Sequence, residues 1–139
     1  MVNNVKVIVD TGPLVAFINK RDTFHEWVKQ QLAALNPPLF TCEAVLSEAA
    51  FLLRHLPRGR ETLLECLKRD LVRIAFSVQE EAGALLALIT RYQNVPMSLA
   101  DACLVRMSEQ SHGCHIFTLD SHFQIYRKHG RQIIPTVSP

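Results

Sequence analysis

Residues 5–13 read VKVIVDTGP, and they join two kinds of local structure. The stretch from 5 to 9 is rich in β-branched residues, which favour a strand. Thr11, Gly12 and Pro13 then supply a turn and a proline suited to the first turn of a helix. A strand leading directly into a helix is therefore expected here, with the carboxylate of Asp10 at the junction.

The same alternation continues along the chain. Helical spacing of apolar residues covers 22–35, 43–56, 60–70, 78–92 and 98–110, with strand character at 39–41, 71–76, 115–119 and 132–134. Asp22 can cap the first of these helices, and a short helix is expected before the last strand. Strands alternating with helices indicate an α/β fold with a mostly parallel sheet covered on both faces. With 139 residues and no linker or repeat, we expect a single domain over residues 1–139.

Composition excludes several classes of protein. With 48% apolar and 20% charged residues, the chain is neither disordered nor fibrous. The longest apolar run, 82–89, is far too short to span a bilayer, and Asp10 interrupts the first apolar run before a signal-peptide core forms. We therefore expect no membrane span and a cytoplasmic location. The four cysteines form no Cys-x-x-Cys pair and are expected to be buried reduced thiols, while a net charge of +2 does not by itself indicate nucleic-acid binding.

Four acidic residues occupy unusual places in this pattern. Asp10 and Asp120 follow the first and fourth predicted strands, and parallel sheets bind ligands at the carboxyl ends of their strands. Glu48 lies at the margin of an apolar helix face, and Asp101 lies on a helix face that is expected to be buried. Each has an ordinary explanation: Asp10, Asp101 and Asp120 can cap helices, and Glu48 can extend into solvent.

Capping does not explain why all four acids fall at positions that the fold gathers at one edge of the sheet. Clustered carboxylates raise one another's pKa values unless a cation compensates their charge. An oxygen-only cluster suits Mg²⁺ or Mn²⁺, and such ions activate water and stabilise charge on a phosphoryl group. The four acids therefore predict a divalent metal site that cleaves phosphate esters.

Four motifs carry a family resemblance over nearly the whole chain. They are VIVDTGPL at 7–14, LSEA at 46–49, SLADA at 98–102 and TLDSHF at 118–123. In this order and at these separations the chain resembles PIN-domain ribonucleases, specifically the VapC-like toxins of bacterial toxin–antitoxin pairs. The resemblance implies a three-layer α/β/α fold, metal-dependent cleavage of RNA, frequent homodimerisation and inhibition by a cognate antitoxin.

The resemblance also assigns roles to the four acids. It implies that Asp10 and Asp101 ligate the metal, that Asp120 ligates it or bonds its waters, and that Glu48 positions or deprotonates the attacking water. Thr118 is a possible polar supporter. Gly12 stands where the family often has Ser or Thr, so any hydroxyl there would come from Thr11.

Two basic groups could hold RNA phosphates, or could simply be solvated surface charges. They are Arg54, Arg58 and Arg60 around the turn at 57–59, and Lys20 and Arg21 after the first helix. A homodimer is further suggested by Phe24 and Trp27 near the start of an otherwise amphipathic helix.

Three alternatives remain open at the sequence level. A non-catalytic PIN-fold binding module would keep the fold while lacking an acid, yet all four are present. A housekeeping PIN nuclease would carry the same residues as a toxin. The VDTG sequence at 9–12 also resembles the aspartic-protease signature, but that fold is almost all β, and the helical patterns at 22–35 and 78–92 argue against it.

Overall fold

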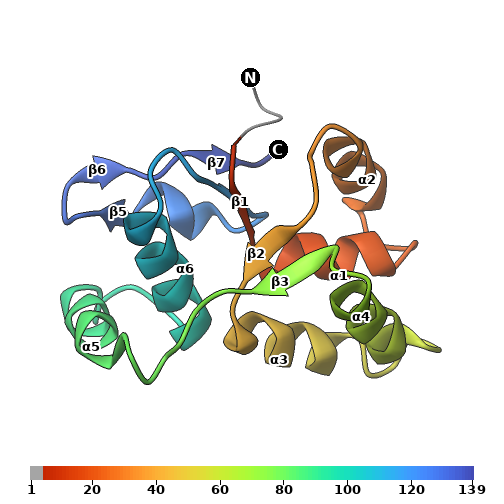
Figure 1. Cartoon of the computed structure of the whole chain (residues 1–139), viewed down its shortest axis with the longest axis horizontal. Coiled ribbons are helices and arrows are strands. Elements are labelled where there is room, and N and C mark those ends of the chain that lie inside the picture. The colour runs from red at the N-terminus through yellow and green to blue at the C-terminus, as the bar shows by residue number, and fades with distance from the viewer. Residues whose placement is uncertain (1–4) are drawn as a thin grey trace.

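A parallel β-sheet forms the centre of the molecule (Figure 1). The structure, a computed structural model, describes residues 5–139, so residues 1–4 of the predicted domain lie outside it. The sheet has five strands in the order β3-β2-β1-β4-β7, and all of its pairings are parallel. The strands are β1 (Val7–Val9), β2 (Leu39–Thr41), β3 (Val72–Ile74), β4 (His115–Phe117) and β7 (Thr136–Val137).

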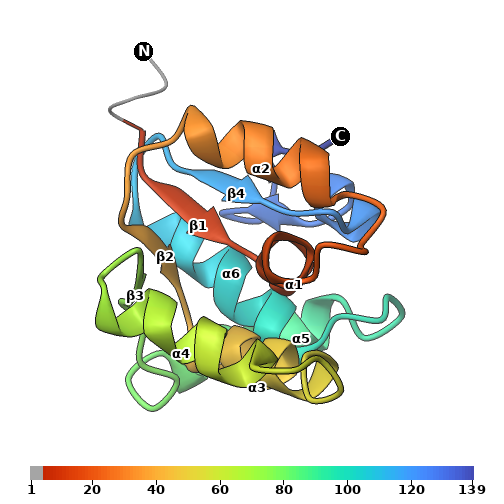
Figure 2. The same cartoon turned by 90° about the vertical axis from the view of Figure 1, so that its right-hand side faces the viewer.

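Helices cover both faces of this sheet. They are α1 (Thr11–Ile18), α2 (His25–Ala33), α3 (Glu43–Leu52), α4 (Gly59–Lys68), α5 (Ala82–Arg91) and α6 (Leu99–Gln110). Figures 1 and 2 show α1, α2 and α4 on one face and α5 and α6 on the other. Helix α3 contacts both α1 and α6, so it joins the two helical layers. The expected α/β fold with three layers is confirmed.

The central strand shows why the sheet is so strongly apolar. All three residues of β1 are buried, and Ile8 lies between Phe40 of β2 and Ile116 of β4. A strand covered on both faces cannot alternate polar and apolar residues, because neither face meets water. The continuous run of Val7, Ile8 and Val9 therefore places β1 in the middle of the sheet, and Asp10 emerges at its carboxyl end.

The last predicted strand is the main error in the sequence-based prediction. Residues 132–134 were expected to join the sheet, but β6 (Gln132–Ile133) pairs antiparallel with β5 (Arg127–Lys128) in a separate hairpin. His129 and Gly130 adopt positive φ angles of 52° and 79°, which turn the chain back on itself. The fifth strand of the sheet is instead β7, a two-residue strand too short to leave a periodic pattern.

Several helix ends also differ from the prediction. The helix expected from 22 begins at His25, because Asp22 Oδ1 accepts a hydrogen bond from the backbone N–H of Phe24 at 2.9 Å and shapes the preceding turn. The helix expected over 43–56 ends at Leu52, and that expected over 78–92 begins at Ala82. All four cysteines are buried and free, as predicted. Among residues 5–139, no helix is long and apolar enough to cross a bilayer.

Candidate active site

Asp10 lies at the carboxyl end of the central strand and caps the helix that follows. The backbone N–H of Thr11 donates to Asp10 Oδ1 at 2.7 Å, and the Thr118 hydroxyl donates to Asp10 Oδ2 at 2.7 Å. Asp10 is only 6% exposed, so both of its oxygens are held in a buried setting. Asp10 caps the helix as predicted. Helix capping does not require the second hydrogen bond, which comes from the Thr118 hydroxyl.

Asp120 follows the neighbouring strand β4 and is joined to Asp10 through the same threonine. The Thr118 hydroxyl, which donates to Asp10, also accepts a hydrogen bond from the Asp120 backbone N–H at 2.9 Å. Asp120 Oδ1 in turn accepts from the His122 backbone N–H at 2.9 Å and lies 2.8 Å from His122 Nδ1. The fully buried Thr118 therefore fixes the two strand ends relative to each other.

Asp101 reaches the same place from the start of α6. Ser98 and Asp101 form the expected capping box: the Asp101 N–H donates to Ser98 Oγ at 3.0 Å, and the Ser98 N–H donates to Asp101 Oδ2 at 3.3 Å. The hydroxyl of Tyr126 also donates to Asp101 Oδ2, at 2.9 Å. Burial and the charge of Asp101 raise the pKa of Tyr126, so its hydroxyl stays protonated and remains a donor.

Glu48 approaches from α3 and is the most exposed of the four acids. Its Oε2 accepts a hydrogen bond from the Thr11 hydroxyl at 3.0 Å. Thr11 therefore supports two acids, Asp10 through its backbone and Glu48 through its side chain. Gly12 has no hydroxyl, and the hydroxyl that contacts Glu48 is that of Thr11.

The four acids line a single cavity of about 570 Å³. Its other lining residues are Thr11, Gly12, Val15, Asp22, Phe24, Leu52, Pro96, Ser98, Leu119 and His122. Among residues 5–139, no lysine or arginine lines it. Acids that are far apart in the sequence thus meet in one strongly anionic cavity.

Crowding and burial change the acid–base behaviour of Asp10. Its pKa rises from 3.8 to about 6, mainly because burial disfavours the charged form, and the charges of Asp101 and Asp120 add to the rise. The hydrogen bonds from Thr118 and Thr11 act in the opposite direction but do not prevail. Asp10 is still mostly ionised at neutral pH, but its negative charge is less favourable there than in water, and a nearby cation would offset that cost.

The donor set fits a hard divalent cation. Asp101 Oδ1, Asp120 Oδ2 and Glu48 Oε1 accept no hydrogen bond from residues 5–139, while the second oxygen of each acid is held by a protein donor. Carboxylate oxygens without nitrogen or sulfur ligands suit Mg²⁺ or Mn²⁺. As they stand, no three acidic, histidine or cysteine side chains in the described part of the chain are close enough to hold one ion. The acids would have to close around it.

Comparison with known proteins assigns this arrangement to a family. The family model of the PIN domain matches residues 7–128. The chain belongs to the PIN domain family. This match confirms the resemblance inferred from the four acidic motifs.

The structure is similar to a solved PIN-fold toxin. The crystal structure of Mycobacterium tuberculosis VapC20, described as a sarcin–ricin loop cleaving toxin, matches with a TM-score of 0.78. The match covers 94% of this chain and 100% of the other, at 20% sequence identity. At that identity the likeness concerns the fold. A search of curated proteins found no match to the sequence.

The basic residues predicted to bind RNA lie outside the acidic cavity of this PIN domain. All five are exposed: Lys20, Arg21, Arg54, Arg58 and Arg60. Arg54 stacks over the ring of Phe51, with its guanidinium carbon 3.7 Å from the ring centroid, and donates to the Phe51 carbonyl at 2.7 Å. Lys20 and Arg21 directly precede Asp22, which lines the cavity. An RNA-binding role for the five remains a prediction.

The aromatic residues that suggested a homodimer do not form one surface. Trp27 is partly buried and packs edge-on against Phe117, with ring centroids 5.9 Å apart. Phe24 is 38% exposed and lines the acidic cavity instead. The sequence reasoning therefore missed Phe24 as a residue of the site, together with Asp22, His122 and Tyr126. Only His122, two residues after an acid in a motif, had a signal that could have indicated it.

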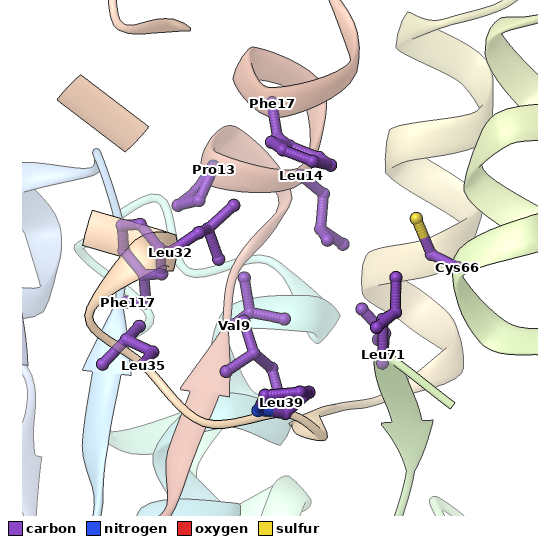
Figure 3. Close-up of a pocket in the computed structure, with 12 residues that line it drawn as sticks. Val9, Pro13, Leu14, Phe17, Leu32, Leu35, Leu39, Cys66, Leu71 and Phe117 are labelled. Carbon is purple, nitrogen blue, oxygen red and sulfur yellow. The ribbon is translucent and has the colours of Figure 1, made fainter. Parts of the chain in front are cut away.

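A second cavity lies under the first turns of α1 and carries no acid (Figure 3). Its volume is about 170 Å³, and its walls are almost wholly apolar, including Val9, Leu14, Phe17, Leu39 and Phe117. The thiol of Cys66 also faces it, and burial raises the pKa of that thiol. Its lining has no carboxylate, imidazole or cationic side chain, and its thiol is held in the protonated form, so we do not include this cavity in the candidate active site.

Proposed function

We propose that this PIN domain is a metal-dependent ribonuclease that hydrolyses phosphodiester bonds in RNA, and that it is the toxin of a toxin–antitoxin pair. The observation that carries the proposal is the convergence of Asp10, Glu48, Asp101 and Asp120 in one cavity. Capping explains three of these acids one at a time. It does not explain why segments separated by tens of residues bring four carboxylates together against their mutual repulsion.

Each acid has a separate task in the proposed reaction. Asp10 and Asp101 hold the cation, and Asp120 ligates it or orients the waters around it. Bound Mg²⁺ or Mn²⁺ supplies Lewis-acid chemistry, lowering the pKa of water and compensating charge on the phosphate. Glu48 is the exposed acid, and the Thr11 hydroxyl anchors its Oε2, so it orients the attacking water and accepts its proton.

The walls of the cavity favour contacts to a base over contacts to phosphates. No lysine or arginine among residues 5–139 lines it, so neither residue type contacts the phosphate at the reacting bond from the cavity wall. Phe24 presents an exposed ring on the same wall, and unpaired RNA bases stack readily on aromatic side chains. An unpaired base beside the scissile bond, with flanking phosphates on Lys20 and Arg21, fits this arrangement.

The proposed biological setting of the nuclease is a toxin–antitoxin pair. A toxin requires a cognate antitoxin, and the motive for this assignment is that VapC20, a protein of the same fold, is described as a toxin. A homodimer is supported by exposed apolar side chains on α5, Leu86 and Ile89. A non-catalytic binding module is disfavoured because all four acids are retained and brought into one cavity.

Cleavage of a looped RNA with and without divalent cation tests the proposed activity. We expect cleavage with Mg²⁺ or Mn²⁺, none in EDTA, and recovery when the cation is restored. Glu48→Gln should reduce the rate at saturating Mg²⁺ by about 100-fold, the usual contribution of a general base. Glu43→Gln is the matched control, since Glu43 is an exposed acid on the same helix that does not line the cavity. Cleavage that persists undiminished in EDTA would overturn the metal-dependent mechanism.

A further inference from the structure

Tyr126 lies behind the acidic cavity and contacts one of its acids. It is fully buried, and its hydroxyl donates to Asp101 Oδ2 at 2.9 Å across 25 positions of sequence. The hydroxyl does not line the cavity, so it has no direct access to substrate. Any effect of this hydroxyl on the reaction must therefore pass through Asp101.

The ring of Tyr126 is locked in place by other aromatic rings. Tyr92 at the end of α5 packs against it edge-on with centroids 5.2 Å apart, and Phe123 packs against it at 90° and the same distance. Tyr92 is itself held by the Arg127 backbone N–H, which donates to its hydroxyl at 2.9 Å. A tyrosine confined in this way delivers its hydroxyl to one point, because its ring cannot swing.

The two hydrogen bonds that the Asp101 carboxylate accepts differ in length, and both are made to Oδ2. Oδ2 accepts from Tyr126 at 2.9 Å and from the Ser98 N–H at 3.3 Å, whereas Oδ1 accepts nothing from residues 5–139. The capping bond is long, so it restrains rotation of the carboxylate only weakly. The shorter bond from Tyr126 is thus the stronger restraint.

Tyr126 also touches the support of a second acid. His122, whose Nδ1 lies 2.8 Å from Asp120 Oδ1, stacks on the Tyr126 ring with centroids 6.5 Å apart and an angle of 26°. The hydroxyl of Tyr126 therefore holds one acid directly, and its ring face supports the residue that holds another.

We propose that Tyr126 is a positioning residue that holds Asp101 Oδ2 and so presents Oδ1 to the divalent cation. The inference rests on the proposed function, since it names the residue that orients one of the metal ligands. Groups that hold a metal ligand in place commonly change metal affinity by 10- to 100-fold when removed. Loss of the Tyr126 hydroxyl should weaken metal binding in the same way, although the hydroxyl contacts neither the cation nor the RNA.

Tyr126→Phe tests this, because it removes the hydroxyl and keeps the packed ring. Binding of Mn²⁺ alone, followed by the electron paramagnetic resonance signal of free Mn²⁺, should weaken about tenfold. The matched control is Ser108→Ala, which removes a buried hydroxyl from the same helix as Asp101 that bonds the Val105 carbonyl and contacts no acid, and its Mn²⁺ affinity should equal that of the parent. In Asp101→Asn, adding Tyr126→Phe should cause no further loss, because the hydroxyl acts through Asp101.

A rescue variant keeps the test decisive if Tyr126→Phe does not fold. Replacing Tyr126 with p-aminophenylalanine retains a donor at the same point and should preserve the parent's affinity for Mn²⁺. A tenfold loss in this folded variant, or parental affinity in folded Tyr126→Phe, would overturn the positioning role while leaving the ribonuclease proposal intact. A parent protein that neither binds Mn²⁺ nor cleaves RNA would overturn both.

Discussion

Replacing Asp10 with asparagine tests whether the four acids are crowded. A pKa raised from 3.8 to about 6 means that ionised Asp10 destabilises the metal-free fold by about 3 kcal/mol at pH 7.5, since each tenfold change in acidity corresponds to about 1.4 kcal/mol. Asparagine removes that charge, but its one side-chain oxygen replaces only one of the two acceptor oxygens, so one of the hydrogen bonds from the Thr11 N–H and the Thr118 hydroxyl is lost, at a cost of about 1–2 kcal/mol. Asp10→Asn should therefore be more stable than the parent by about 1–2 kcal/mol at pH 7.5 in EDTA.

The pH dependence of this difference follows from the direction of the shift. Because the pKa of Asp10 is higher in the folded state, folding takes up protons between pH 3.8 and about 6, and stability falls as pH rises through that window. The destabilisation is absent below pH 3.8 and complete above about pH 6. Relative to the parent, Asp10→Asn should thus be the less stable protein at pH 3.5 and the more stable one at pH 7.5.

Urea unfolding in EDTA at the two pH values measures this, with Mg²⁺ titration and RNA cleavage alongside. Asp10→Asn should abolish cleavage, and Mg²⁺ should raise the melting temperature of the parent more than that of the variant. Asp22→Asn is the control, because it removes one charge from the same cavity at a residue with no proposed metal contact. An active Asp10→Asn enzyme with the parent's response to Mg²⁺ would refute the four-acid site, and equal destabilisation at both pH values would refute the crowding.

Three further predictions concern Thr118, which holds Asp10, Phe24, which lines the cavity, and the homodimer. Thr118→Val should destabilise the fold by about 1–3 kcal/mol in urea and weaken Mn²⁺ binding about tenfold. The control is Thr41→Val, which removes a buried hydroxyl bonded to the Val9 carbonyl and should lower stability without changing Mn²⁺ affinity. If the Thr118 and Thr41 variants bind Mn²⁺ equally well, Thr118 does not support the metal site. Phe24→Ala should raise KM for looped RNA about tenfold with little change in kcat. The control is Phe17→Ala, which should leave KM unchanged, because Phe17 is equally exposed at 38% but lines the apolar cavity. Equal KM values for the two variants would exclude stacking of an RNA base on Phe24. Sedimentation at micromolar concentration should show a homodimer that Leu86→Glu dissociates, and a monomeric parent would contradict this.

The sequence determined the fold class, and it singled out the four acids that line one cavity in the structure. The apolar run at Val7–Val9 can only be a strand covered on both faces, and the alternation of strands and helices makes its neighbours parallel. Parallel strands end at one edge, so Asp10 and Asp120 were expected at the same edge of the sheet, and the structure makes β1 and β4 neighbours there. Local periodicity was sufficient for these inferences because each depends on residues close together in the chain.

Only the tertiary structure decided how those acids are held. The bond from Thr118 to Asp10 spans 108 positions and that from Tyr126 to Asp101 spans 25, and neither distance has a periodic signature. The same holds for Phe24, whose ring lines the acidic cavity while Trp27, three residues later, packs on Phe117. Short strands such as β7 are likewise defined by their partner, since two residues form a strand only when the edge of β4 supplies the hydrogen bonds. Hydrogen bonds and ring contacts between distant segments depend on how the layers pack, and packing is a property of the whole chain.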